Sequence, residues 1–344
     1  MAVDRRDGGV STSFWTGKAV LVTGAAGFIG SHLVEALVDR GARVRAIGRS
    51  RRRFNAALLE RAGEVEFLEG DLMDPAFAAA ASAGIEVVCH LAARVAGVAY
   101  NASHPATMLT ENAVLGLQVM AAAARAGVER VLCMSSACVY RADCAISTPE
   151  SEGFLDDPEP TNFGYGWAKR FLEVQAIAYQ REFGMKVAIV RPYNTFGPRD
   201  DFAWQTSHVI PALIRKVMDG SDPVVVWGDG TQTRTFLYVS DVVEGSLKAL
   251  ECYAVGDPVN LGTDEEVTIA DLVRMIVELS GRAPRLVFDA RQPVGQVRRH
   301  GDSTKAKERL QFSPRVSLRE GLRRTIQWYA KHRSTSEVSF HGVA

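Results

Sequence analysis

Short apolar runs alternate with helical patterns through the first half of this 344-residue chain, and this alternation constrains the fold more than any other feature. The run at residues 19–23 is apolar almost throughout, which is typical of a strand buried on both faces of a sheet. Similar runs, mostly separated by helical segments, follow at residues 44–47, 65–68, 87–91, 130–134 and 187–190. The alternation predicts an α/β fold with a doubly wound parallel sheet, whose ligand lies beyond the carboxyl ends of the strands.

The pattern becomes irregular after Pro192. Apolar spacing there predicts a short strand at 224–226 and helices near residues 209–218, 241–251, 269–280 and 318–330. We interpret this half as a smaller lobe that closes over the substrate. The expected boundaries are a flexible N-terminus at 1–17, the main α/β domain at 18–195, the smaller lobe at 196–332 with some elements interleaved, and a tail at 333–344.

Composition argues against several classes of function. Lys+Arg and Asp+Glu each total 40, so the formal net charge is zero and bulk binding to nucleic acid or a membrane surface is not expected. Residues 1–17 lack the apolar core of a signal peptide, and no apolar run is long enough to cross a bilayer. Five scattered cysteines do not form a disulfide framework, so we expect a reducing, cytoplasmic location. We assign no metal ligands.

A glycine-rich turn follows the first strand and opens a helix. Glycines there let the backbone approach a pyrophosphate, and a helix N-terminus offers free N–H groups and a positive dipole end. The spacing is GxxGxxG and not the GxGxxG of the dinucleotide fingerprint, and a plain tight turn is the alternative interpretation. In this strand–turn–helix context the motif predicts a bound dinucleotide, with contacts from Gly24, Ala26, Gly27, Phe28, Ile29 and Gly30.

Two further positions bear on the cofactor. Asp71 and Leu72 follow the third strand, where the carboxylate can accept from the adenine amine and the Leu can pack on the ring; an ordinary strand-end turn is the alternative. The second strand ends in Gly48-Arg49, with Arg51 close behind. Arg at this point suits a ribose 2′-phosphate, whereas an acidic residue suits a free 2′-hydroxyl. The pattern favours NADP, although such arginines are also often simply solvated, so NAD and NADP both stay open.

Tyr165 and Lys169 lie four residues apart, on one face of a helix, and Ser136 lies upstream. An adjacent ammonium can lower the pKa of a phenol because it favours the phenolate. A Ser hydroxyl can hydrogen-bond the same substrate oxygen. Together these groups could take a proton from a sugar hydroxyl while a hydride leaves for a nicotinamide. Cys138 is the unusual member of the set.

These motifs occur together in a fixed order, joined by Leu91-Ala92-Ala93, Asn112 and Arg191-Pro192-Tyr193-Asn194. The combination resembles the extended short-chain dehydrogenase/reductases, the sugar-nucleotide epimerase/dehydratase family, over roughly residues 18–332. The resemblance implies a Rossmann-like NAD(P) domain, a C-terminal lobe for a nucleoside-diphosphate sugar, and a homodimer. It makes Tyr165 the base, with Lys169 lowering its pKa and holding the nicotinamide ribose. It makes Leu91, Ala92, Ala93 and Asn112 cofactor contacts, and Ser136 and Asn194 substrate contacts.

Further stretches resemble two groups within that family. Residues 135–140, which contain Cys138, are similar to GDP-mannose 3,5-epimerases, in which the matching Cys is an acid/base group at carbon. Residues 207–213, which contain His208, are similar to GDP-fucose synthases, in which the matching His pairs with a Cys. By the same resemblance Arg234 and Arg299 contact the nucleotide diphosphate, with Arg298 as the alternative to Arg299. The chain departs from the epimerases in having His208 where they have Lys, and in ending its second strand in Gly48-Arg49 where they have Asp.

The Cys and His suggest chemistry at carbon. A C–H beside an alcohol is too weak an acid for a side chain, but oxidation of the neighbouring carbon to a ketone makes the proton removable. Cys138 and His208 suit removal and return of a proton on opposite faces, since small shifts bring both to neutral pH. The alternatives are a small core residue for Cys138, and a helix cap or core residue for His208.

We therefore predict a nucleoside-diphosphate-sugar epimerase that acts through a transient 4-keto intermediate and inverts C3, C5 or both, with a GDP-sugar favoured by the resemblance. An epimerase/reductase that consumes NADPH is the first alternative, and a UDP-sugar 4-epimerase is a weaker one. A non-catalytic NAD(P)-binding protein is disfavoured by the intact Ser136, Tyr165 and Lys169. A 4,6-dehydratase is disfavoured because Ala137-Cys138 replaces the Asp-Glu pair of that group.

Overall fold

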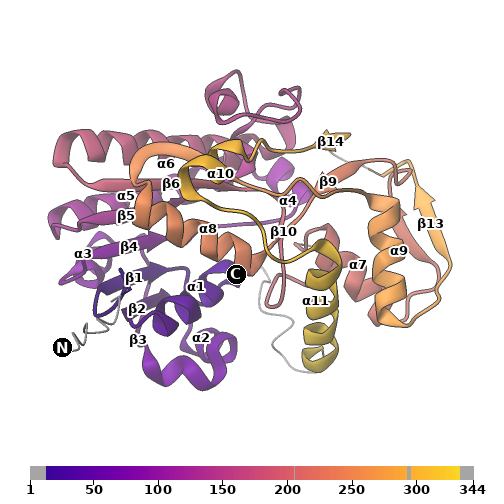
Figure 1. The fold of residues 1–344 in the computed structure, drawn as a ribbon, viewed down its shortest axis with the longest axis horizontal. Helices are drawn as coiled ribbons and strands as arrows, with labels where there is room; N and C mark the ends of the chain where they lie inside the picture. The colour runs from indigo at the N-terminus through magenta and orange to yellow at the C-terminus, as the bar shows by residue number, and fades with distance from the viewer. Residues whose placement is uncertain (1–12, 205, 293–295, 334–344) are drawn as a thin grey trace, which may run out of the picture.

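The computed structural model describes residues 13–204, 206–292 and 296–333, and places them around one central sheet (Figure 1). The sheet has seven parallel strands in the order β11-β6-β5-β4-β1-β2-β3. Their bounds are Ala19–Thr23 (β1), Arg43–Gly48 (β2), Glu66–Glu69 (β3), Val87–His90 (β4), Arg130–Met134 (β5), Lys186–Pro192 (β6) and Val255–Leu261 (β11). The predicted doubly wound sheet is confirmed.

Helices cover both faces of the sheet. One face carries α1 (Phe28–Asp39), α2 (Arg51–Leu58) and α8 (Val239–Cys252). The other carries α3 (Pro75–Ser82), α5 (Pro105–Arg125) and α6 (Phe163–Phe183). A separate apolar core fills each interface, and β1 is buried along its whole length. Burial on both faces is the reason that these strands are apolar throughout and do not alternate.

Strand β11 returns to this sheet from the second half of the chain. It pairs with β6 in parallel, with Val259 opposite Val190, and α8 packs beneath the same edge. The strand order reverses between β1 and β4, and the carboxyl ends of these two strands form the crevice where ligands of such sheets bind.

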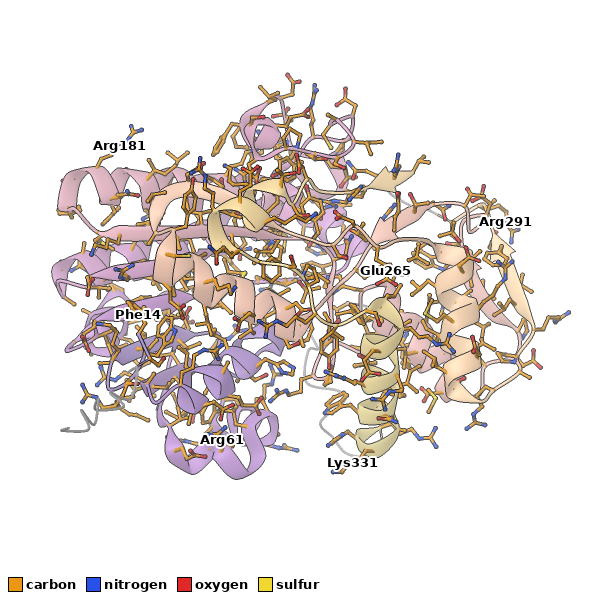
Figure 2. All side chains as sticks on the ribbon, viewed as in Figure 1. Phe14, Arg61, Arg181, Glu265, Arg291 and Lys331 are labelled. Atoms are coloured by element: carbon orange, nitrogen blue, oxygen red, sulfur yellow. The ribbon has the colours of Figure 1, made fainter. Side chains whose placement is uncertain are left out.

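The remaining elements form a smaller lobe, which lies at the right of Figure 1. Helices α7 (Val209–Met218), α9 (Ile269–Ser280) and α11 (Leu318–His332) pack on the paired strands β8 (Val224–Trp227) and β13 (Leu286–Asp289) around their own apolar core. Figure 2 shows Arg291 at the outer edge of this lobe, and Glu265, which accepts the N–H of Leu318 at the start of α11 at 2.8 Å.

The other described elements are short. They are α4 (Val98–Ser103), α10 (Thr304–Leu310), β7 (Thr195–Phe196), β9 (Thr233–Thr235), β10 (Leu237–Tyr238), β12 (Glu266–Thr268), β14 (Arg298–Arg299) and the 3-10 helices η1 (Leu59–Glu64), η2 (Ala137–Val139), η3 (Glu150–Phe154) and η4 (Pro160–Asn162). None of the described helices is long and apolar enough to cross a membrane. Across the same residues, no group of His, Cys, Asp or Glu side chains could hold a metal ion.

The chain ends lie mostly outside the described residues, which leave out 1–12 and 334–344 of the predicted N-terminus and tail. Trp15, in the segment expected to be flexible, is fully buried, and its indole N–H donates to Glu251 on α8. The five cysteines are free thiols.

Candidate active site

Ser136 and Cys138 lie just beyond the carboxyl end of the central strand β5. The Ser136 hydroxyl accepts the backbone N–H of Cys138 at 3.1 Å and so caps the short helix η2. This bond holds the Ser136 side chain and the Cys138 backbone together at the carboxyl end of β5. Two residues that the sequence places close together therefore belong to one rigid turn.

Two glycines bring Tyr165 to this turn. A Cβ on Gly166 would clash with the carbonyl oxygen of Cys138, and a Cβ on Gly164 would clash with the carbonyl oxygen of Pro105. Only glycine lets the start of α6 approach both segments so closely. These two glycines were not predicted as site residues, although the pattern Gly-Tyr-Gly around the predicted base could have indicated a close helix contact.

Lys169 lies one turn further along α6 and is almost fully buried. Its Nζ donates to the carbonyl oxygen of Met134 at 2.8 Å and lies 5.5 Å from the centre of the Tyr165 ring. Burial lowers the pKa of Lys169 to about 8, against the opposing effect of Cys133, Cys138 and Glu173. The ammonium is thus held at the end of β5, beside the phenol.

The electrostatics of Tyr165 differ from the expectation. Burial raises the pKa of Tyr165 well above its ordinary value, the neighbouring Cys138 raises it further, and a hydrogen bond with Ser136 lowers it in part. The lowering by Lys169 that the sequence predicted is not seen, because removal of the phenol from water dominates and Nζ is bound to the Met134 carbonyl. The phenol therefore carries its proton.

A buried ion pair that the sequence analysis missed lies behind Lys169. Glu173, on the same face of α6, accepts from Arg191 of β6 at 2.8 and 2.6 Å, and the two side chains are 0% and 1% exposed. Ser135 donates to the same carboxylate, and Arg191 also donates to the Tyr140 hydroxyl at 2.9 Å. The spacing of four residues between Lys169 and Glu173 was the available signal.

The glycine-rich turn has the geometry of a phosphate cradle. A Cβ on Gly30 would clash with the carbonyl oxygen of Gly24, and Gly24, at φ +68°, passes so close to Ala92 that its own Cβ would lie 2.9 Å from the Ala92 nitrogen. Gly27 begins α1 with no side chain capping the helix. The N–H groups at the start of α1 therefore face the crevice without side-chain cover, as a bound pyrophosphate requires.

The next predicted cofactor residues line the same crevice through their backbones. Thr23 ends β1, and its hydroxyl accepts the N–H groups of Leu91 and Ala92 at 3.1 and 3.0 Å. The same hydroxyl bonds His90 at 3.0 Å, and burial lowers the pKa of His90 to about 3, so this ring is neutral. Ala93 follows in the same loop, at the carboxyl end of β4.

Several predicted cofactor side chains have structural partners. Asn112 bonds the backbone of Arg94 as acceptor (2.9 Å) and donor (3.1 Å), so it shapes the loop after Ala93. Asp71 accepts the N–H of Met73 at 2.9 Å, and Leu72 is buried in the core beneath α3. Phe28 and Ile29 lie in the first turn of α1, and Ala26 packs against the core of that face.

The arginines at the end of β2 fall into two kinds. Arg51 donates to the carbonyl oxygen of Phe67 at 2.8 Å and lies over the Phe67 ring at 4.6 Å. Arg49 is exposed at the mouth of the crevice, directly after β2. Arg49 is thus the better placed of the two for a ribose 2′-phosphate.

Arg234 and Arg299 lie side by side on the parallel strands β9 and β14. Burial and the charge of Arg299 lower the pKa of Arg234 to about 10. Arg299 donates to the carbonyl oxygen of Ala137, in the catalytic turn, whereas Arg298 is ion-paired with Glu266 at 2.7 Å. Of the two alternatives, Arg299 therefore faces the turn that carries Cys138. The neighbouring guanidinium of Arg234 donates to the carbonyl oxygens of Thr233 and Gln296.

Arg299 also borders the thiol of Cys138. Burial acts to lower the pKa of Arg299, but the charges of Cys138 and Tyr193 and a hydrogen bond with Cys138 raise it. A cavity of about 550 Å³ borders strand β14 at Arg298 and is also lined by Cys144, Glu159 and Gln296.

His208 and Asn194 come from the segment that leads to the smaller lobe. His208 begins α7, and its side chain is 52% exposed. Among the described residues, no hydrogen bond or ion pair joins it to Cys138. Asn194, at φ +32°, donates to the carbonyl oxygen of Thr235 at 2.8 Å and so holds the lobe strand β9 to the end of β6.

Comparison with known proteins agrees with this geometry. The chain is 34% identical to a dTDP-4-dehydro-6-deoxy-D-allose reductase of a Streptomyces species, over 93% of this chain and 98% of that protein. It is 31% identical to the GDP-L-fucose synthase of Escherichia coli K12, over 92% and 97%. The UDP-glucose 4-epimerase of Thermotoga maritima, solved with UDP-glucose, superposes with a TM-score of 0.82 at 29% identity and covers 92% of this chain and 100% of that one.

The sequence profile of the NAD dependent epimerase/dehydratase family matches residues 20–262, which include the glycine-rich turn, Ser136, Tyr165 and Lys169. The uncapped start of α1 and the close-packed glycines fit the nicotinamide dinucleotide that this family uses. The chain is therefore a member of the NAD-dependent epimerase/dehydratase family of enzymes.

Proposed function

We propose that this enzyme inverts one or two carbons beside the ketone of a 4-keto nucleoside-diphosphate sugar and then reduces C4. The observation that carries the proposal is the position of Cys138, whose thiol borders both Tyr165 and Arg299 in the turn that Ser136 caps. A redox site and an acid/base group at carbon thus share one crevice. Two relatives, named as a keto-sugar reductase and a fucose synthase, support a reaction that ends in reduction.

Reduction of the C4 ketone needs a group that donates a proton to the carbonyl oxygen. The nicotinamide, when bound, supplies the hydride for carbon. Tyr165, whose pKa is raised by burial, is neutral at pH 7 and gives its proton to the C4 oxygen. The Ser136 hydroxyl donates a hydrogen bond to the same oxygen. Lys169, fixed by the Met134 carbonyl, holds positive charge beside the phenolate that results.

Inversion precedes this reduction, while C4 is still a ketone. Cys138, as thiolate, removes the proton from the neighbouring carbon, and the electron pair moves to the C4 oxygen as an enolate. Tyr165 and Ser136 stabilise that oxygen by hydrogen bonds. The guanidinium of Arg299 hydrogen-bonds this sulfur and so holds it in place beside the sugar. His208 returns a proton to the opposite face of the carbon, which completes the inversion.

The substrate's diphosphate occupies the place between Arg234 and Arg299. Arginine binds phosphate oxygens in pairs of parallel hydrogen bonds, and an anion relieves the repulsion between the two guanidiniums. The nucleoside then extends toward the adjoining cavity, and Asn194 lines the passage between the sheet and the lobe. The sugar faces Cys138 and the start of α6.

The cofactor lies over the glycine-rich turn. We assign its pyrophosphate to residues 24–30 and its nicotinamide ribose to Tyr165 and Lys169. The loop 91–93, shaped by Asn112, borders its path, and Asp71 and Leu72 lie at the adenine end. Arg49 supports a preference for NADP because it is exposed where a 2′-phosphate would lie.

A redox-neutral epimerase, which recycles its cofactor, is the second candidate. Likeness to the UDP-glucose 4-epimerase of Thermotoga maritima favours it. Incubation with GDP-, dTDP- and UDP-linked sugars separates the two, when each is supplied both as the 4-keto sugar with NADPH and as the 4-hydroxy sugar with the oxidised nicotinamide. The reductive enzyme oxidises one NADPH for each keto sugar, read as loss of absorbance at the reduced-nicotinamide band. The redox-neutral enzyme inverts a 4-hydroxy sugar without net consumption of nicotinamide, and no product from either kind of sugar would refute both.

We also propose that the enzyme is a homodimer through α5 and α6. These two helices pack side by side and expose a set of large apolar side chains, which are Leu109, Leu117, Phe171 and Val174. Light scattering should give twice the chain mass. Phe171→Glu should give a monomer, whereas Phe183→Glu, at the far end of α6, should leave the dimer intact; a wild-type monomer would contradict the proposal.

A further inference from the structure

The loop between β7 and α7 holds a buried carboxylate without a complete set of partners. The Asp200 side chain is only 3% exposed. Its Oδ1 accepts the backbone N–H of Asp201 at 2.7 Å, but its Oδ2 is buried and, among the described residues, has no hydrogen-bond partner. A buried, ionised oxygen without a partner is costly, so a positive group nearby is expected.

His208 is the group that faces this carboxylate. Its Nδ1 lies 3.8 Å from Asp200 Oδ1, within ion-pair range but beyond a hydrogen bond. The half-exposed ring has room to move onto the carboxylate. His208 also begins α7, and the positive end of a helix dipole disfavours an imidazolium there. A charged ring at this position therefore depends on its carboxylate neighbour.

We propose that Asp200 is the positioning residue of His208: it receives Nδ1–H, turns Nε2 toward the sugar, and keeps the ring protonated until Nε2–H is delivered to carbon. This inference rests on the proposed function, since it gives the proton donor of the inversion its partner. In that step Nε2 loses its proton to the enolate carbon and the ring becomes neutral. Nδ1–H stays on Asp200, and water restores the proton on Nε2.

The other charged groups of this segment are already engaged. Asp201 accepts the N–H of Ala203 at 2.9 Å and the hydroxyl of Thr206. Arg199 is ion-paired with Glu35 at 2.6 Å. Arg215 of α7 donates to the carbonyl oxygen of Phe202 and lies over the Trp204 ring at 4.0 Å. Neither cation is directed to His208.

The charges that act on the ring agree with this arrangement. Partial removal from water lowers the pKa of His208, but the carboxylates of Asp200 and Asp201 outweigh it and raise the pKa above its ordinary value. A carboxylate within a few ångströms favours the charged form of a His. The two carboxylates thus favour the imidazolium, which is the form that can donate a proton.

NMR titration of the histidine ring protons in the full-length enzyme tests the proposal. The chain has seven histidines, and the His208 signal is identified by its loss in His208→Gln. In the wild type, His208 should titrate above the ordinary value of about 6.5. Asp200→Asn should lower its pKa by about one unit or more, and Asp200→Glu should retain most of the rise. Asp201→Asn, the neighbour whose carboxylate is bound elsewhere, should shift the pKa less.

Circular dichroism confirms that each variant is folded before titration. A wild-type His208 that titrates at or below the ordinary value would overturn the proposal even if no Asp200 variant folds. An unchanged pKa of His208 in folded Asp200→Asn would also overturn the proposal. The proposed function fails separately: if His208→Gln still incorporates solvent deuterium and inverts the sugar, His208 is not the proton donor, whatever its pKa shows.

Discussion

Replacing Glu173 by Gln keeps the shape of the side chain but leaves the buried Arg191 without its counter-ion. Both side chains are buried, at 0% and 1% exposure, and two hydrogen bonds of 2.8 and 2.6 Å join them. Removal of one partner from such a pair costs about 3–5 kcal/mol, because an uncompensated charge stays buried. At about 2.1 cal/mol/K of unfolding entropy per residue, this lowers the Tm by about 4–7 °C.

Urea unfolding followed by circular dichroism measures the loss. Glu182→Gln is the matched control, because Glu182 lies exposed on the same helix and should change the free energy of unfolding by less than about 0.5 kcal/mol. Glu173→Gln combined with Arg191→Met should recover part of the loss, since the buried cation is gone. Equal stability of Glu173→Gln and Glu182→Gln would refute the energetic importance of the pair.

The same substitution should change the pH dependence of catalysis. Burial lowers the pKa of Lys169 to about 8, and the charge of Glu173 opposes that lowering. The ammonium is lost as pH rises through this pKa, so kcat/KM should fall above about pH 8 in the wild type. In Glu173→Gln the alkaline limb should move to lower pH. If the alkaline limb lies at the same pH in Glu173→Gln and in the wild type, Glu173 does not influence the pKa of Lys169.

Three further predictions concern the ligands. Gly30→Ala should destabilise the fold by about 1–3 kcal/mol in urea unfolding and weaken NADPH binding, whereas Gly63→Ala, which has open space, should do neither. Arg234→Gln should weaken binding of the nucleoside diphosphate at least about tenfold by calorimetry, and Arg291→Gln, at the outer edge of the smaller lobe (Figure 2), should change it little. Arg49→Ala should weaken NADP more than NAD in a fluorescence titration; equal losses would remove the 2′-phosphate assignment.

The parts of the fold that depend on local pattern were predictable. Residues 187–190 are wholly apolar and β-branched for the most part, which favours a strand buried on both faces of a sheet. Helix α9 was expected at 269–280 because its buried residues Ile269, Leu272, Val273 and Ile276 follow one helical face. Strand β11 was not predicted, since Val255–Leu261 contains Gly, Asp and Pro and becomes a strand only by pairing with β6.

In the functional site, too, the features set by local sequence were predictable and those set by distant segments were not. Ser136 with Cys138, and Tyr165 with Lys169, were predictable because each pair is close in the chain and held by one turn or one helix. The raised pKa of Tyr165 was not, because burial comes from segments distant in sequence. Pairing of Asp200 with His208 also depends on how a loop folds back on α7, which no local pattern encodes.

Solvent-deuterium incorporation is the most direct test of the claim that Cys138 acts at carbon within a ketone-handling site. The enzyme and Cys138→Ser are each incubated with the 4-keto nucleoside-diphosphate sugar in deuterated water, and the sugar carbons are read by NMR. The wild type should incorporate deuterium beside C4. Cys138→Ser should incorporate none, yet still oxidise NADPH with the keto sugar. Undiminished incorporation in Cys138→Ser would contradict the account.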